Sequence, residues 1–343
     1  MYTRRSFLIS SILTATCQGF SNAQAPATRL NLAEIDRARI LTAANRALFQ
    51  QPAPDGNLQS TAFLDLTLNI PALAAACVID PPAAPRYAVH AAAHLEAWFL
   101  NARTRPTLTL GTESYEPLLD LAALAETAVA IPFLPFEPAF TARLKTSFAS
   151  YLTFLTEDRT ALLARDSNSH HASGWFLQTS AFAHLTGNEK ILTDCRHRFK
   201  TATIRAQINS SGAFPHELTT DNPFRNSLFN LDLLAGTCVL LTTRFESVWD
   251  HELQDGPGMR AAVAHHAPFI KDRKTWPYRS DSTHFNDLPA RRPALLFAAR
   301  AYSQPDYAAL WQTLTPDPTD PEILRTFPIR QPILWQTRAR PPI

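Results

Sequence analysis

The sequence predicts an all-α protein whose helices pair into antiparallel hairpins arranged as an incomplete (α/α) toroid. Apolar residues recur at helical spacing in roughly ten to twelve segments of similar length. Glycine is scarce and proline abundant, 9 against 27, and the prolines fall between the apolar runs, where they end helices. Only short pieces such as residues 107–110 look like strands, and no fixed-period repeat indicates a solenoid. Such hairpins, with their loops on one side, would form a cleft.

The boundaries of the expected helices follow the apolar periodicity. Gly187-Asn188, for example, should end the helix that begins near Trp175. The full set is expected at residues 32–50, 72–77, 87–100, 116–130, 139–154, 174–186, 189–207, 229–243, 259–266, 293–302 and 307–314.

Composition indicates one globular domain over residues 26–343 and excludes several kinds of partner. Of the 343 residues, 45% are hydrophobic and 18% are charged, which supports a packed core. The net charge is +2 and no basic tract appears, so a nucleic-acid partner is not expected. No glycine-rich phosphate loop is present, and no cofactor or metal is expected. Any anionic ligand would be met by local charge. We expect a monomer.

Residues 1–25 resemble an export signal of the twin-arginine type. Arg4-Arg5 precede a short apolar run, and Ala23-Gln-Ala25 has the form of a cleavage site. The alternative is an ordinary secretory signal with two arginines in its charged region. The run is too short for a comfortable membrane span, so we expect no transmembrane segment and a periplasmic or secreted protein.

Three cysteines remain after that segment, namely Cys77, Cys195 and Cys238. An odd number at wide spacing is no disulfide framework, and each lies in an apolar or helical context. Buried thiols are therefore expected, although a single bridge such as Cys77–Cys195 is an alternative.

The first polar cluster is His170-His171, which follows Asn168 and Ser169 and precedes the helix led by Trp175. Two imidazoles in a loop before a helix feel the positive end of its dipole, which lowers their pKa. A neutral imidazole can then accept a proton at working pH. The alternative is a surface pair that caps the helix.

A second cluster places His216, Glu217, Arg225 and Asn226 in one short span that leads into the helix expected from residue 229. These side chains offer proton-transfer groups and a cation to an anionic ligand. The alternative is a loop in which Asn222-Pro223 simply starts the helix.

Other polar residues are weaker candidates for a functional site. Tyr278 follows Trp276-Pro277 and is a candidate proton donor or sugar-stacking ring. His90 and His94 share one helix face at metal-ligand spacing without a third ligand, and we interpret them as structural. His265-His266 is interpreted in the same way. A glycosidase would need a pair of carboxylates in a cleft, and none of the candidates has an evident partner. Those candidates are Glu113, Glu116 and Glu217.

Over residues 60–340 the chain resembles the alginate lyase superfamily, whose α/α-toroid fold is related to polysaccharide lyase family 5. Residues 169–178 are similar to the family segment Asn-Asn-His-Gly…Trp. Residues 212–231 are similar to the segment that contains Glu-Leu and ends in Phe-Asn-Leu. The stretch Trp276-Pro-Tyr278 and residues 292–302 carry the rest of the resemblance.

The resemblance implies a uronate polysaccharide as substrate and cleavage by β-elimination. In the family an Asn-His pair and an arginine neutralise the carboxylate or abstract the proton, and a tyrosine acts as acid and base. His171 matches the family histidine. His170 occupies the place of the preceding asparagine, whose amide Asn168 can supply. The family arginine falls on Thr220 and the tyrosine on Asn226, which cannot replace a phenol.

Three functions are compatible with these residues. The first is an exported polysaccharide lyase with a rearranged site and an anionic polysaccharide as its partner. Its residues would be His170 or His171 as base, Arg225, Asn226, Asn168 and Trp175 as substrate ligands, and Tyr278 or His216 as acid. The second is a non-catalytic glycan-binding protein, suggested by the changes at Thr220 and Asn226. The third is a glycan hydrolase, which requires the carboxylate pair.

Overall fold

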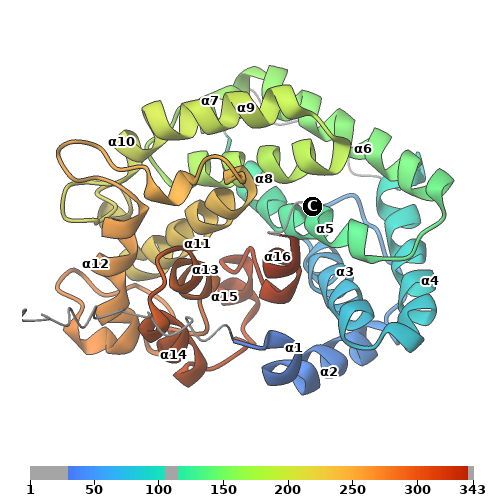
Figure 1. Ribbon diagram of the computed structural model, residues 1–343. Helices are drawn as coiled ribbons and strands as arrows, with labels where there is room; N and C mark the ends of the chain where they lie inside the picture. Colours follow the sequence, from blue (N-terminus) through green and yellow to red (C-terminus); the bar gives the residue numbers. More distant parts are fainter. Residues whose placement is uncertain (1–29, 105–114, 339–343) are drawn as a thin grey trace, which may run out of the picture.

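The computed structural model describes residues 30–104 and 115–338, and these residues form helices and turns with no strand. The predicted all-α class is therefore confirmed. Figure 1 shows the helices in two layers along an arc, the incomplete toroid. The inner layer consists of α3 (Thr61–Ile79), α5 (Leu124–Ala130), α8 (His170–Thr186), α11 (Pro223–Leu241), α13 (Pro293–Ala301) and α16 (Pro332–Arg338). The outer layer consists of α2 (Arg37–Ala47), α4 (Ala84–Leu95), α6 (Pro138–Glu157), α9 (Glu189–Arg198), α12 (Met259–Lys271) and α14 (Pro305–Thr313).

Neighbouring helices of the two layers run antiparallel, as α6 and α8 show. The Trp175 indole near the start of α8 donates to the carbonyl of Leu155 near the end of α6 at 2.8 Å. Further along, the ring of Phe182 packs edge-on against Phe148, with centroids 5.1 Å apart. Gly187 then ends α8 in the left-handed conformation (φ 74°), as the sequence predicts.

The inner helices α8 and α11, in contrast, run parallel to each other. His170 at the start of α8 lies against Phe229, with ring centroids 5.6 Å apart. At the other end, Nε2 of His184 lies 2.6 Å from the carbonyl of Leu240. Gly236 permits this close approach, because a Cβ there would lie 2.8 Å from the Leu177 side chain. Both N-termini, with their partial positive charge, therefore lie at the same end of the toroid.

Several helices begin earlier or extend further than the apolar pattern predicts. α3 was expected from residue 72 but begins at Thr61 and contains Pro71. Proline has no N–H for the carbonyl four residues earlier, and Nη1 of Arg330 donates to that Thr67 carbonyl at 3.3 Å. α11 begins at Pro223, and α12 continues through Pro268. Four short helices were not expected, namely α1 (Leu32–Ile35) as a separate element, α7 (Arg159–Arg165), α15 (Pro321–Arg325) and α16. The strand-like residues 107–110 lie outside the described residues.

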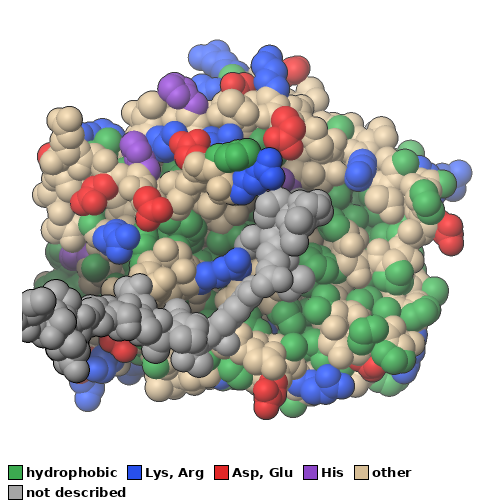
Figure 2. Space-filling view, in the orientation of Figure 1, with side chains coloured by type: hydrophobic (Ala, Val, Ile, Leu, Met, Phe, Trp, Pro, Cys, Tyr) green, Lys and Arg blue, Asp and Glu red, His purple; other side chains and the backbone are tan. Residues whose placement is uncertain are grey.

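α3 is also the one described helix that is long and apolar enough to cross a membrane. Its mean hydropathy reaches 1.9, but 78% of that window is buried inside the protein. It packs against α2, α4 and α5 as a core helix. On the face shown in Figure 2, acidic and basic side chains are interspersed, in keeping with the small net charge.

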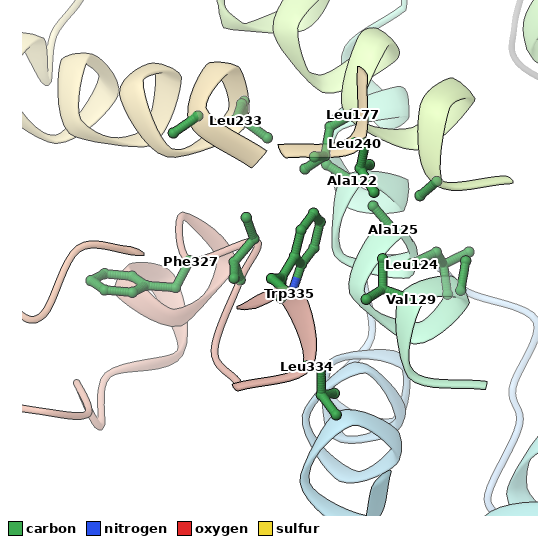
Figure 3. Packing of buried hydrophobic residues seen from close by; sticks show 14 of the residues in the cluster. Ala122, Leu124, Ala125, Val129, Leu177, Leu233, Leu240, Phe327, Leu334 and Trp335 are labelled. Carbon is green, nitrogen blue, oxygen red and sulfur yellow. The ribbon is translucent and has the colours of Figure 1, made fainter. Parts of the chain in front are cut away.

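Buried polar groups tie the C-terminal segment to the core. The fully buried carboxylate of Glu126 on α5 accepts the backbone N–H groups of Arg330 (2.9 Å) and Gln331 (2.7 Å) and the indole N–H of Trp335 (3.2 Å). Burial raises the pKa of Glu126 above its usual value. Figure 3 shows Trp335 among apolar side chains of α5, α8 and α11, including Leu177. The three cysteines are buried free thiols, as expected.

A buried ion pair joins α11 to α13. Asp232 and Arg292 have no exposed surface, and Nη1 of Arg292 donates to Oδ2 of Asp232 at 3.0 Å. Oδ1 of Asp232 accepts the N–H of Ala294 in the first turn of α13 at 3.1 Å. The guanidinium also lies 3.9 Å from the ring centroid of Phe327. Desolvation raises the pKa of Asp232 to about 6.

We predict that Asp232→Leu will destabilise the protein by about 3–5 kcal/mol, because it leaves the Arg292 guanidinium buried without a counter-charge. Urea unfolding followed by circular dichroism measures the loss. The double variant Asp232→Leu/Arg292→Met should recover most of it, since no unpaired charge remains. A single variant as stable as the wild type would show that the pair does not hold these helices.

Candidate active site

The histidine pair forms the first turn of α8 rather than the loop before it. Ser169 is the N-cap, and its hydroxyl accepts the N–H of His171 at 3.4 Å and lies 2.9 Å from Nδ1 of the same residue. Gln207 donates to the Ser169 carbonyl at 2.6 Å and accepts from the Asn230 amide at 3.0 Å. The prediction that the pair lies in a loop is therefore wrong. The helix begins earlier because its N-cap is supported by side chains distant in sequence.

Glu217 is the partner of His170. It begins the 3-10 helix η6 (Glu217–Thr219) and has no exposed surface. Oε1 accepts the backbone N–H of His170 at 2.7 Å, and Oε2 lies 2.6 Å from Nδ1 of its ring. A carboxylate accepts hydrogen bonds, so Nδ1 is the donor in this contact, and in the Nδ1–H tautomer Nε2 carries the lone pair. Within the described residues, Nε2 has no hydrogen-bond partner.

The two imidazoles form part of an aromatic cluster. His170 and His171 stack with centroids 4.6 Å apart and an interplanar angle of 25°. Tyr115, just before the 3-10 helix η3 (Glu116–Ala123), lies edge-on to His171 at 5.0 Å. This phenol was not predicted from the sequence, because it lies far upstream in no recognisable motif. It brings a hydroxyl-bearing ring to the pair.

The positions matched to the family arginine and tyrosine lie together beside Glu217. The amide of Asn226 donates to the Thr220 hydroxyl at 3.1 Å. That hydroxyl donates to the Glu217 carbonyl at 2.8 Å. The second predicted cluster therefore does join the first, through Glu217, at the N-terminal ends of α8 and α11.

Arg225 is held on the other side of the first turn of α11. Its guanidinium pairs with Glu322 of α15 at 2.6 Å, and its backbone N–H donates to Asp281 at 3.0 Å. Only 8% of the Arg225 side chain is exposed. The neighbouring guanidinium lowers the pKa of Glu322. The positive charge of Arg225 is thus already matched by a carboxylate.

The other predicted residues lie outside this group of contacts. Trp175 is 4% exposed and packs in the core between α6 and α8. Tyr278 packs on Trp276 (4.9 Å) and His265 (6.4 Å) of α12. His216 and Asn168 are exposed, on the turns before Glu217 and before Ser169 respectively. Glu113 lies outside the described residues.

The remaining histidine pairs have structural partners. Nε2 of His90 and of His94 both lie within hydrogen-bond distance of the Gln50 carbonyl, at 2.9 and 3.1 Å. His266 is buried, stacks on Phe214 at 4.8 Å and donates from Nδ1 to the Ala262 carbonyl at 2.8 Å. Desolvation lowers the pKa of His266 to about 3.

The helical layers place the chain among the all-α proteins with an incomplete α/α toroid. The family model described as alginate lyase matches residues 38–276, and the chain belongs to the alginate lyase family. A solved structure of an alginate lyase from Bacteroides ovatus is similar, with a TM-score of 0.73 and 18% identity. The match covers 84% of this chain and 93% of that one, and at this identity it shows the fold. No curated protein matches the chain in sequence.

The buried His266 predicts a loss of stability in acid. Its pKa falls from 6.5 to about 3 on folding, so its contribution is complete above pH 6.5 and is lost as the pH falls towards 3. Between pH 8 and pH 5 this amounts to about 2 kcal/mol. Urea unfolding at pH 8 and at pH 5 measures how much stability is lost on acidification. This loss should be smaller in His266→Phe than in the wild type by that amount. An equal pH dependence in the variant would contradict a neutral buried His266.

Proposed function

We propose that the protein is a polysaccharide lyase that cleaves a uronate-containing polysaccharide by β-elimination. The observation that carries this proposal is the buried Glu217 carboxylate bonded to His170 at the start of α8, in a member of the alginate lyase family. Elimination needs a base for the C5 proton, positive potential at the adjacent carboxylate, and an acid for the leaving oxygen. The contacts around this pair offer a group for each task.

His170 is the base in this proposal. Glu217 holds the proton on Nδ1, which leaves the lone pair of Nε2 to accept the C5 proton. As that proton leaves, its electron pair forms the C4–C5 double bond and the C4–O bond breaks. The imidazolium that forms is stabilised by the Glu217 carboxylate, with which it shares a short hydrogen bond.

The substrate carboxylate is met by the amide of Asn226, at the N-terminal ends of α8 and α11. The first N–H groups of these helices are already bonded to the carboxylates of Glu217 and Asp281. Arg225 lies in the first turn of α11 but is paired with Glu322. We therefore assign the contact with the carboxylate to Asn226, and to Arg225 a supporting charge behind it.

Tyr115 is the acid that protonates the leaving oxygen. It contacts His171, which stacks on His170, so the phenol lies near the proposed base. His171, held by Ser169, positions both rings. Tyr278 packs on α12 instead, which makes it the weaker candidate.

The purified chain should release unsaturated products from at least one of alginate, glucuronan and related uronans, measured by ultraviolet absorbance. A folded protein without activity on any of them would overturn the lyase assignment. Binding of oligouronates without turnover, measured by calorimetry, would then identify a glycan-binding protein. The neutral Thr220–Asn226 pair at the positions matched to the family arginine and tyrosine favours that second candidate.

We predict that Glu217→Gln will lower kcat by about 10²–10⁴-fold. The glutamine carbonyl still accepts the His170 N–H, but its NH₂ group donates to Nδ1, so the ring proton moves to Nε2 and the base is lost. Thermal unfolding should show that the variant remains folded. Activity close to that of the wild type would show that His170 is not the base.

Tyr115→Phe tests the acid separately. Loss of the phenol should lower kcat by about 10²-fold or more with little change in KM, because the ring still packs on His171. Tyr278→Phe, measured alongside, should remain close to wild type. The reverse result would transfer the acid role to Tyr278.

We also propose that residues 1–25 direct export to the periplasm or beyond. The support is the Arg4-Arg5 motif followed by the apolar run. These residues lie outside the described part of the chain.

A further inference from the structure

A hollow lies between the N-terminal and C-terminal ends of the arc, and we call it the seam cavity. It has a volume of about 530 Å³ and lies between α2 and α3 on one side and the segment 316–332 with α13 and α14 on the other. Figure 1 shows α2 and α3 facing α14, α15 and α16 in this part of the molecule. None of its lining residues belongs to α8, α11 or η6, so it is separate from the His170–Glu217 site.

The walls of the seam cavity carry an excess of positive charge. Four guanidiniums line it against two carboxylates, those of Asp65 and Asp317. The guanidiniums belong to Arg39, Arg46, Arg291 and Arg330. Buried Asp36, outside the lining, pairs with two of them, Arg39 at 3.1 Å and Arg291 at 2.8 Å, and Arg39 also pairs with Asp317 at 3.1 Å. Arg46 is exposed at the rim and has no partner among the described residues.

Two donors on these walls are buried without an acceptor. The Nε1–H of Trp311, a side chain only 2% exposed, has no hydrogen-bond partner in the described structure, and neither does Nε of Arg330. An unmatched buried donor costs about 1–3 kcal/mol. Neither atom has accessible surface, so an oxygen of a ligand in the cavity would reach it only after a local shift of its neighbours. The guanidinium of Arg291 lies 4.3 Å from the Trp311 ring centroid, which fixes both groups.

The remaining lining residues suit a polyhydroxylated ring. The Asn69 amide donates to Oε1 of Gln50 and Arg39 donates to Oε1 of Gln331, which leaves the NH₂ groups of the two glutamines as donors for hydroxyl groups. Leu68 and Phe327 supply apolar surface of the kind that packs against the faces of sugars. A volume in this range matches that of small-molecule sites in proteins.

We propose that the seam cavity binds a small carboxylated saccharide, a uronate monosaccharide or disaccharide. Arg46 would pair with its carboxylate, and the Trp311 indole, after a local shift of its neighbours, would donate to one of its oxygens. The choice of a uronate among carboxylated sugars rests on the proposed function, whereas the need for an anionic, oxygen-rich ligand rests on the cavity alone. The site would hold a product or a chain end away from the catalytic histidines.

Calorimetry with the Glu217→Gln variant tests the site without turnover. Titration with glucuronate, mannuronate and an unsaturated diuronate should detect binding of at least one of them. Arg46→Gln and Trp311→Phe should each weaken it by about tenfold, the effect of about 1.4 kcal/mol. Arg86→Gln, which removes an exposed arginine of α4 outside the cavity, is the matched control and should change nothing.

Several outcomes would overturn the proposal. These are no uronate binding, binding that is unchanged in both cavity variants, or glucose or inorganic phosphate bound as tightly as the uronates. Thermal unfolding of Trp311→Phe separates a lost contact from a damaged fold, and Arg46→Gln alters only an exposed side chain. Because binding is measured in an inactive variant, a positive result stands even if the wild-type chain cleaves no uronan. Conversely, lyase activity without cavity binding would overturn this inference alone.

Discussion

The buried carboxylate of Glu217 is the constraint on which the candidate site depends. An unpaired charge without exposed surface would cost several kcal/mol, so each oxygen must be matched by a hydrogen bond. One oxygen accepts the first N–H of α8 and the other contacts the His170 ring. The same carboxylate thus sets where the helix begins, which way the imidazole faces and which of its nitrogens carries the proton. Rotation of the ring would leave the charge unmatched.

The parallel packing of α8 and α11 gives that carboxylate its setting. Inner helices that share a direction bring their N-termini to one end, where backbone N–H groups and partial positive charge accumulate. Asp281 supplies oxygens to two of these N–H groups on α11, those of Phe224 and Arg225. At the opposite edge of the core, Arg330 supplies the donor that Pro71 cannot give to Thr67. α11 and α3 therefore both depend on hydrogen-bonding groups from distant parts of the chain.

This dependence explains which features could be predicted from the sequence. Helical periodicity is local, so the fold class, the hairpins and the stop at Gly187 were predicted correctly. Helix starts were placed too late where the cap comes from far away, as Asp281 does for α11. His170 and Glu217 were each recognised as polar candidates, but nothing in their spacing indicated that they touch. Arg225 looked free in the sequence because its partner Glu322 lies in a short helix that was not expected.

The change at the two family positions alters the chemistry that remains. An arginine and a tyrosine would offer a full positive charge and a transferable proton, whereas Thr220 and Asn226 bond to each other and offer neither. In the proposed elimination, the proton for the leaving oxygen must then come from another group beside His170. In our proposal Tyr115 gives that proton to the leaving oxygen, and Glu217 keeps the His170 imidazole oriented after it has taken the C5 proton. The stacked His171 and the edge-on Tyr115 provide a second ring and a phenol in the same aromatic cluster. We therefore assign proton transfer to the start of α8 rather than to the start of α11.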